Sequence, residues 1–317
     1  MWPFCALPES SSWEDVRGPS LPGTHRPRSL IPSPAMTDPI TIRIAHSPDS
    51  DDAFMFYALT QGLLDTEGLV IEHVLQDIET LNQAAFDGTY EITALSFHGY
   101  AYLSDLYQLM PSGASFGDGY GPVVVARQPY GRADLPGLRV AIPGKLTTAH
   151  LALRLWQPGI DPVILPFDQI LDAVLNSEVD AGVVIHEGQL TYGDLGLRAV
   201  VDLGVWWKEE TGGPLPLGGN GIRRDLDEGL KRRLCRLLTQ SINYGLDHRQ
   251  EALGYAVRYA RGLEDDPERS DRFVGMYVNE WTRDYGRAGR KAVQLLLDRG
   301  HEAGILPRRI EAEFVEI

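Results

Sequence analysis

This sequence of 317 residues has only two cysteines, no long apolar run and no excess of basic residues. The two cysteines, Cys5 and Cys235, lie far apart, which excludes a cysteine-based metal site and is typical of a reducing compartment. No stretch approaches the ~18 consecutive apolar residues of a membrane-spanning helix. The formal charge of −15 and the pI of about 4.9 argue against a nucleic-acid partner, since no basic stripe offsets them. We therefore expect a cytoplasmic protein without nucleic-acid or membrane partners.

The first part of the chain also lacks regular structure signals. Residues 1–35 are crowded with proline and serine and show no hydrophobic periodicity. They have neither the basic start nor the apolar core of a secretory signal. We interpret residues 1–36 as a disordered tail or an over-long start, with Met36 as the expected true first residue.

From Ile40 onward, short apolar strands alternate with helical patterns, which predicts an α/β fold with a mostly parallel sheet. Two stretches rich in glycine and proline, 112–137 and 211–224, interrupt this alternation. We interpret them as crossings between a discontinuous lobe, residues 37–127 plus 220–317, and an inserted lobe, residues 128–219. A central cleft between two such lobes is a usual place for a small ligand. This segment order predicts a two-lobed, periplasmic-binding-protein-like fold.

Hydroxyl side chains lie in the loops where predicted strands end and predicted helices begin. These residues are Ser47, Ser50, Ser96, Thr147 and Thr148. Serine and threonine at such places commonly cap helices and contribute about 1 kcal/mol each, so capping is one interpretation. The other is ligand binding, because helix starts also present free N–H groups to an anion. Their convergence at the carboxyl ends of strands favours a small anionic ligand.

His186 is the strongest single candidate for chemistry. The apolar run Ala181 to Ile185 leads directly into His186 and Glu187, where a turn of glycine or asparagine would be ordinary. A histidine titrates near neutral pH, so it can accept a proton and return it. A structural role for a lone histidine is the alternative.

Other chemical patterns in the chain do not match known sites. "PGKLTT" is not a phosphate-binding loop, because Arg139 occupies the position where that motif needs its first glycine, and Lys145 is expected to supply a positive charge near a carboxylate. The acidic run Asp49, Asp51 and Asp52 lacks the spacing of a calcium loop, and a helix dipole favours acids in its first turn. The histidines have no metal-binding spacing, so we expect no metal.

The aromatic pair Trp206 and Trp207 has two interpretations. The two rings could form the wall of a site for a flat ligand, or they could be ordinary core residues.

Eight segments together resemble one enzyme family, the 1,4-dihydroxy-6-naphthoate synthases of the futalosine route to menaquinone. The resemblance extends from about Ile42 to near Pro307. Its segments are "FMFYAL", "DIETLN", "ALSFHGYA", "GYGPVVVAR", "RVAIPGKLTTAHLAL", "AGVVIHEGQLTYGDLGL", "VVDLGVWWKEETGGPLPLG" and "YVNEW". Their combination is specific, whereas any one alone would not be.

The resemblance implies a type 2 periplasmic-binding-protein-like fold used as a lyase. Its substrate would be cyclic dehypoxanthinyl futalosine, and no cofactor would be needed. His186 would be the general base, and its proton abstraction would start an elimination that aromatises the naphthalene and expels the sugar fragment. Ser96, Thr148, the neighbouring Thr147 and Asp52 would contact the substrate.

One departure from the family pattern lies in the first loop. Relatives often read Cys-Pro-Asn-Asp where this chain reads Asp49-Ser50-Asp51-Asp52, so an ionisable acid, Asp51, replaces an amide that can donate hydrogen bonds. This change bears on which substrate the loop accepts.

Two alternative functions share the fold. One is the sister enzyme that dehydrates chorismate, against which the "IHE" histidine and "GYGPVVVAR" argue. The other is a non-catalytic solute-binding protein for a small anion, which would need an export signal. The residues do not indicate an oligomeric state.

Overall fold

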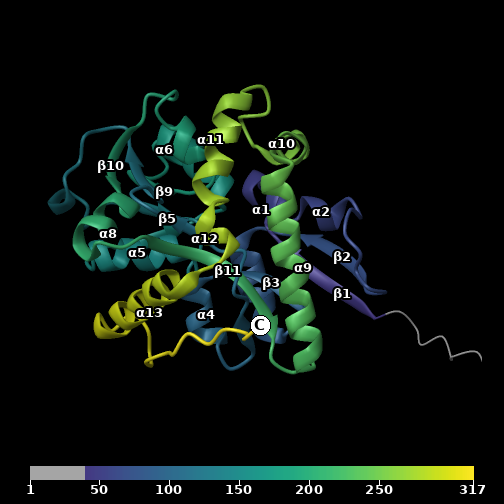
Figure 1. The fold of residues 1–317 in the computed structure, drawn as a ribbon. Coiled ribbons are helices and arrows are strands. Elements are labelled where there is room, and N and C mark those ends of the chain that lie inside the picture. The colour runs from purple at the N-terminus through teal and green to yellow at the C-terminus, as the bar shows by residue number, and fades with distance from the viewer. Residues whose placement is uncertain (1–39) are drawn as a thin grey trace, which may run out of the picture. The chain divides into compact units, whose positions relative to one another are not determined.

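The structure is a computed structural model that describes residues 40–317, so the interpretation of residues 1–36 falls outside it. Within that range the strands form two sheets (Figure 1). The first sheet has the order β2-β1-β3-β11-β4, with β5 also paired to β11. Its strands are β1 (Thr41–His46), β2 (Val70–Leu75), β3 (Ile92–Ser96), β4 (Tyr107–Leu109), β5 (Ser115–Gly117) and β11 (Leu215–Arg223).

The second sheet has the order β10-β6-β9-β7-β8. Its strands are β6 (Val123–Ala126), β7 (Val140–Ile142), β8 (Pro162–Ile164), β9 (Ala181–Val184) and β10 (Arg198–Asp202). Each sheet joins a parallel group, β2-β1-β3 or β8-β7-β9, to antiparallel strands. Both sheets are therefore mixed, because β11 and β6 run antiparallel to all of their neighbours. The other strands of each sheet share one direction, which agrees with the prediction of a mostly parallel sheet.

Helices cover the sheets and carry most of the remaining core. The N-terminal set comprises α1 (Ser50–Met55), α2 (Tyr57–Thr60), α3 (Ile78–Ala84) and α4 (Phe97–Leu103). The middle set comprises α5 (Thr148–Trp156), α6 (Ile170–Leu175), α7 (Gly188–Thr191) and α8 (Leu203–Thr211). The C-terminal set comprises α9 (Glu228–Asp247), α10 (Arg249–Ala256), α11 (Pro267–Tyr277), α12 (Glu280–Arg283) and α13 (Gly286–Glu302). Short 3-10 turns occur at Ala85–Asp87, Arg132–Asp134, Phe167–Gln169 and Val257–Tyr259.

The long amphipathic patterns near the C-terminus form the helices that their spacing predicts. The strand patterns that begin near Ile40 and Leu69 form β1 and β2 in parallel register, with Thr41 opposite Val70. Among residues 40–317, no helix has the length and apolar character needed to cross a membrane.

The strand β11 is the main element that sequence patterns miss. Its glycines and prolines are typical of a loop, yet it pairs with β3, β4 and β5 in the first sheet. Glycine is required there because the neighbours lie very close: a Cβ on Gly219 would stand 2.0 Å from the Tyr285 hydroxyl, and one on Gly221 would stand 2.6 Å from Leu95. The glycines that make β11 resemble a turn are there because this central strand packs closely against its neighbours.

The crossings between the sheets lie near the predicted ones. β6 belongs to the second sheet although it was assigned to the discontinuous lobe 37–127, and β11 belongs to the first sheet although it begins inside the predicted lobe 128–219. The chain thus passes between the sheets within 118–122 and within 203–214. The division into two lobes itself stays a prediction.

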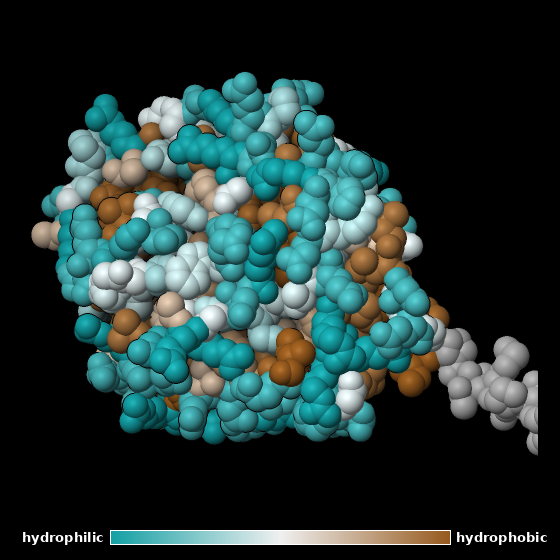
Figure 2. Space-filling view, in the orientation of Figure 1, coloured by the Kyte–Doolittle hydropathy of each residue, from teal (hydrophilic) through white to brown (hydrophobic). Residues whose placement is uncertain are grey.

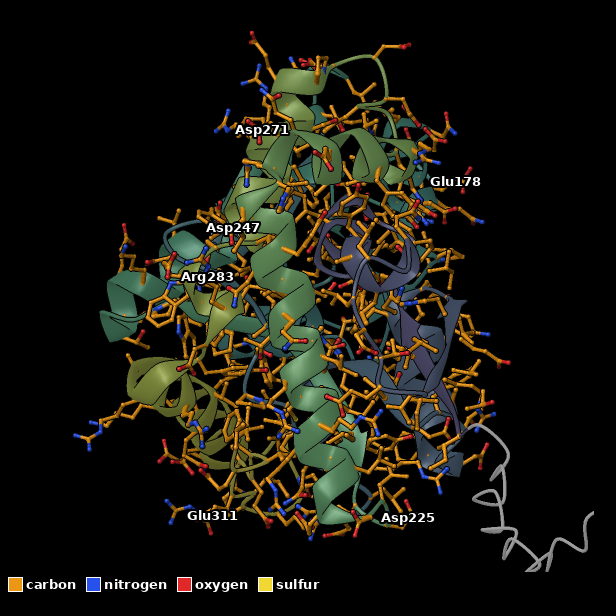
Figure 3. The ribbon with its side chains drawn as sticks, turned by 45° about the vertical axis from the view of Figure 1, so that its right-hand side comes forward. Glu178, Asp225, Asp247, Asp271, Arg283 and Glu311 are labelled. Atoms are coloured by element: carbon orange, nitrogen blue, oxygen red, sulfur yellow. The ribbon has the colours of Figure 1, made fainter. Side chains whose placement is uncertain are left out.

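Charged side chains dominate the surface. In Figure 3, Glu178, Asp225, Asp271 and Glu311 lie on the outside of the ribbon. The face in Figure 2 is mainly hydrophilic, and apolar side chains gather toward the edge where β1 and β2 lie. The edge strand β2 contributes exposed valine and leucine side chains there.

Candidate active site

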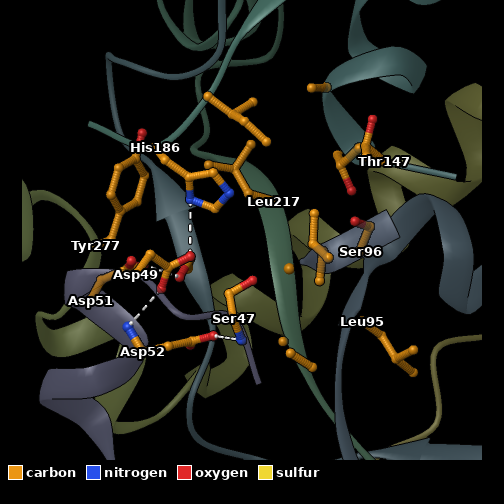
Figure 4. A pocket seen from close by; sticks show the side chains of 18 of the residues that line it. Ser47, Asp49, Asp51, Asp52, Leu95, Ser96, Thr147, His186, Leu217 and Tyr277 are labelled. Atoms are coloured by element: carbon orange, nitrogen blue, oxygen red, sulfur yellow. Dashed lines mark hydrogen bonds and ion pairs between the residues drawn. The ribbon is translucent and has the colours of Figure 1, made fainter. Parts of the chain in front are cut away.

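A cavity of about 120 Å³ lies between the two sheets and collects residues from distant parts of the chain. Its floor is built from β3 and β11 of the first sheet, and its walls come from the starts of α1 and α5, the loop after β9, and α11. Figure 4 shows two chemically different ends. The acidic end holds Asp49, Asp51, Asp52 and His186, and the hydroxyl end holds Ser96 and Thr147.

His186 stands in the loop between β9 and α7 and faces a buried carboxylate. Its Nδ1 lies 3.0 Å from Asp49 Oδ2, and its side chain is 17% exposed while that of Asp49 is 3% exposed. Phe167 packs edge-on against the imidazole with ring centroids 4.9 Å apart. The backbone of His186 has φ +54°, a left-handed conformation that costs a non-glycine residue about 1–2 kcal/mol. The fold therefore holds this side chain in a strained, fixed position at the cavity.

The pairing determines how His186 titrates. Burial alone would lower the pKa of His186, but the charge and hydrogen bond of Asp49 outweigh it, so the pKa is raised above 6.5. Burial alone would raise the pKa of Asp49, but His186 lowers it below the ordinary value. Because an ionised carboxylate only accepts hydrogen bonds, Nδ1 carries the hydrogen and Nε2 is left to accept a proton when the ring is neutral.

Three further carboxyl groups are buried around this pair. Burial, together with the charges of Asp49 and Asp52, raises the pKa of Asp51 well above its ordinary value. Burial and the charge of Asp49 likewise raise the pKa of Asp52, which accepts a hydrogen bond of 2.7 Å from the backbone N–H of Ser47. Burial raises the pKa of Glu187 as well. The acidic end therefore carries fewer negative charges than its carboxyl count.

Glu187 does not line the cavity. It accepts a hydrogen bond of 2.8 Å from Ser50 Oγ, and this bond ties α1 to the loop that carries His186. Ser50 is therefore a structural contact and not part of the cavity surface.

The predicted hydroxyl residues Ser96, Thr147 and Thr148 all line the cavity. Thr147 is also the N-cap of α5, since its side chain accepts from the N–H of His150. Ser96 makes no such cap bond. Instead Asn82 holds it, donating from Nδ2 to Ser96 Oγ at 3.2 Å and accepting from the Ser96 N–H at 3.0 Å. The Ser96 hydroxyl hydrogen is therefore free to point at a ligand.

Some predicted contributors lie elsewhere. Lys145 is exposed and does not line the cavity, so its expected role beside a carboxylate stays a prediction. Trp207 is a core residue whose Nε1 donates to Pro214 O, and Trp206 packs beside it. Among the described lining residues, none is a lysine or an arginine. An anion must therefore be held by hydroxyls and N–H groups.

The remaining histidines near strand ends are held by backbone carbonyls. His46, His98 and His150 each place Nδ1 within 3.1 Å of a carbonyl oxygen, and burial lowers the pKa of each. None of them lines the cavity. These three histidines therefore have a structural role, which is the usual role of a lone histidine.

The sequence patterns did not assign a site role to four residues. Asp49 pairs with His186, Asn82 holds Ser96, and Gln189 and Tyr277 line the cavity. Tyr277 donates to Gln189 Oε1 at 2.6 Å, which links α11 to α7. Tyr277 opens the segment "YVNEW" and Asp49 opens the departing loop, so the signals were present without an assigned role.

One group within residues 40–317 has the proximity of a metal-binding set. A ligand atom from each of Asp49, Asp51 and His186 lies within 4.8 Å of the others. The donor chemistry does not fit a metal well, because Asp49 is already engaged by His186 Nδ1 and the raised pKa of Asp51 favours its neutral form. The set is better described as a hydrogen-bonded acid and base cluster.

Comparisons of sequence place this chain among enzymes of one pathway. A protein-family model described as menaquinone biosynthesis matches residues 42–302. The 1,4-dihydroxy-6-naphthoate synthase of Thermus thermophilus is 44% identical over 264 residues, which cover 83% of this chain and 95% of the relative. The synthase of the same name from Streptomyces coelicolor is 36% identical over 273 residues, covering 84% and 95%.

Comparisons of structure confirm the fold. The crystal structure of a protein from Archaeoglobus fulgidus matches with a TM-score of 0.80 at 50% identity, over 84% of this chain and 98% of that one. The periplasmic aliphatic sulphonate binding protein from Escherichia coli matches with a TM-score of 0.59 at 16% identity, over 87% and 91%. At that identity the likeness concerns the fold alone, and it confirms the predicted periplasmic-binding-protein-like α/β architecture.

Proposed function

The chain belongs to the menaquinone biosynthesis family, and we propose that it is a lyase that converts cyclic dehypoxanthinyl futalosine to 1,4-dihydroxy-6-naphthoate. The observation that carries this proposal is His186, held at the cavity by a buried carboxylate at 3.0 Å. The names of the relatives at 44% and 36% identity support the product. A cytoplasmic location suits an enzyme of this kind, and it is part of the proposal.

His186 is proposed to remove the proton that begins the elimination. Asp49 on Nδ1 fixes the ring orientation and the tautomer, which leaves Nε2 as the accepting atom. The electron pair of the broken C–H bond forms the new double bond, and the pair of the bond to the sugar fragment leaves with that fragment. The product is aromatic, which supplies driving force, so the protein needs only to move protons and no cofactor takes part in the proposed step.

The two ends of the cavity orient the proposed substrate. Its carboxylate would be repelled by the acidic end and accepted at the hydroxyl end by Ser96 and Thr148, beside the free N–H groups at the start of α5. Thr147 would line this end through its position, since its hydroxyl donates to Gly144 O at 2.9 Å. The ring that loses the sugar fragment would then lie at the opposite end, next to His186, Asp51 and Asp52. This placement supports a small anionic substrate.

The test is incubation of the purified chain with cyclic dehypoxanthinyl futalosine, followed by absorbance and mass of the naphthoate. Since the base must be neutral, kcat/KM should rise with pH through a pKa above 6.5. His186→Gln should keep the fold and lower kcat by a factor of about 10² or more, typical for loss of a general base. Near-normal turnover in H186Q would refute the assigned base.

The wild-type reaction separates the alternatives. Absence of product with this substrate would refute the proposed function. Consumption of chorismate would then indicate the sister dehydratase. Binding of a small anion without turnover would indicate a solute-binding protein.

A further inference from the structure

Four carboxyl groups crowd around the one histidine of the cavity. Asp49, Asp51, Asp52 and Glu187 are exposed by 2%, 7%, 9% and 1%, respectively, so none is well solvated. Oxygens of Asp49 and Asp51 and a ring nitrogen of His186 all lie within 4.8 Å of one another. Like charges this close in a buried site do not both ionise readily. One proton must therefore reside on the acid pair Asp49 and Asp51.

Hydrogen bonds indicate which carboxyl is charged. Asp49 receives Nδ1–H of His186 at 3.0 Å and also the backbone N–H of Asp52, so its charge is supported by donors. Asp51 accepts from the Ser115 hydroxyl at 3.4 Å on Oδ2, and its Oδ1 has no partner by distance among the described residues. The carboxyl of Asp49 interacts with Asp51 as well, and this contact raises the pKa of Asp51. A buried carboxylate without donors is costly, whereas a protonated one is itself a donor.

The other groups around the pair do not change this assignment. On α1, Asp52 adds negative charge; from the loop after β9, Glu187 does the same; and on α11 the Tyr277 side chain faces the cavity as a neutral phenol, since burial raises its pKa well above 10.0. Arg261, which stacks over Phe167 at 4.6 Å, lowers the pKa of His186 by less than Asp49 raises it. The described lining holds no lysine or arginine, so His186 is the side chain there that can carry a positive charge beside Asp51.

We propose that Asp51 is a positioning residue that acts through Asp49: it holds the single proton of the acid pair, so that Asp49 remains the ionised partner of His186 while the site keeps a neutral donor toward the cavity. The neutral form of Asp51 prevents a second negative charge from forming beside the imidazole. Such a charge would hold the proton on His186 more tightly and weaken its release to the next step. The inference rests on the proposed function insofar as His186 is the base, but the arrangement of charges can be tested without any substrate.

The experiment is a pH titration of His186 by NMR of the full chain labelled with ¹⁵N-histidine, with the resonance assigned by its loss in H186Q. Asp49→Asn should lower the pKa of His186 below 6.5, because burial then lowers this pKa without the opposing charge and hydrogen bond of Asp49. Asp51→Asn should leave the pKa of His186 within about 0.3 of the wild-type value. Asp118→Asn, which removes a surface carboxylate paired with Lys208, is the matched control and should change nothing.

Two results would overturn the inference. If Asp51 were ionised, its removal at up to 4.8 Å would lower the pKa of His186 by about 2.5, taking an effective dielectric constant of about 20. A pKa of His186 that is lower by one unit or more in D51N than in the wild type therefore refutes the assignment of Asp51 as neutral. An unchanged pKa in D49N would refute Asp49 as the ionised partner.

Kinetics separate this inference from the proposed function. If the wild type turns over the futalosine substrate, D51N should keep the pKa of the acid limb in the pH profile of kcat/KM, while D49N should lose about 10² or more in kcat, as buried partners of catalytic histidines do. If D51N lowers the pKa of the acid limb in the pH profile of turnover by one unit or more, the inference about Asp51 fails although the proposed function stands. If the wild type shows no turnover, the function fails and the titrations still decide the inference. If D51N does not fold, Asp51→Ser, a smaller neutral donor, is titrated in its place with the same two outcomes.

Discussion

The stability of the fold should depend on pH through Asp51, and the size of the effect follows from the cavity geometry. At pH 7 the chain can protonate Asp51, whose ordinary pKa is 3.8, at a cost of about 4 kcal/mol. It can instead keep a second charge within 4.8 Å of Asp49, which costs about 3.5 kcal/mol at an effective dielectric constant near 20, and the cost of taking that charge out of water adds to this. The protonated state is therefore the cheaper one, and it costs the native fold about 4 kcal/mol at neutral pH.

Asp51→Asn removes this cost and introduces a buried amide that costs about 1 kcal/mol. We expect D51N to raise the free energy of unfolding by about 3 kcal/mol at pH 7. The sign follows from the raised pKa of Asp51: its folded form binds a proton more tightly than its unfolded form, so the wild-type penalty grows as pH rises above 3.8 and is absent below it. The stabilisation should therefore vanish near pH 4.

Urea unfolding of D51N and wild type at several values between about pH 4 and pH 8 measures this difference, with equal m-values as the check that the same transition is compared. Asp118→Asn again removes one exposed carboxylate and should shift stability by less than about 0.5 kcal/mol throughout. A difference between D51N and wild type that does not change with pH would refute the electrostatic reasoning. Loss of stability in D51N at pH 7 would refute it as well.

Three further outcomes are expected. Gly219→Ala should destabilise the fold by about 2 kcal/mol, because its Cβ would lie 2.0 Å from the hydroxyl of the buried Tyr285. The control Gly254→Ala lies in α10 with nothing within 4 Å of its Cβ, so it should be neutral or stabilising. Equal urea midpoints for the two variants would contradict this reasoning. Ser96→Ala and Thr148→Ala should raise KM with little change in kcat if their hydroxyls bind the substrate carboxylate, and unchanged steady-state constants in both would leave them as structural residues. Dialysis against EDTA should leave turnover unchanged, and activity restored only by added divalent metal would instead assign the acidic cluster as a metal site.

The pH profile of turnover and the pH profile of stability should move in opposite directions. His186, with its raised pKa, contributes stability that is fully present below 6.5 and is lost as pH rises through the folded pKa. The same deprotonation creates the neutral base. The active form is therefore the less stable form, as expected when a site holds buried titratable groups for function.

Local sequence was sufficient for much of the fold and for the main catalytic candidate. Period-two alternation predicts β1 and β2, and helical spacing predicts α9 and α13, because these signals depend on which face of a single element is buried. His186 could be singled out because an apolar strand ends directly at it. The hydroxyl residues Ser96, Thr147 and Thr148 could be grouped because each follows the carboxyl end of a strand, where ligands usually bind, although β3 and β7 belong to different sheets.

Only the tertiary structure decided the rest, because it depends on contacts between residues far apart in the chain. Asp49 becomes the partner of His186 only when α1 meets the loop after β9, more than a hundred positions later, and nothing in either segment specifies that distance. β11 reads as a loop by composition, and its glycines make sense only beside Tyr285 and Leu95. The charge state of Asp51 likewise follows from burial and from neighbours. Sequence determined which groups are present, and packing determined which of them share a proton.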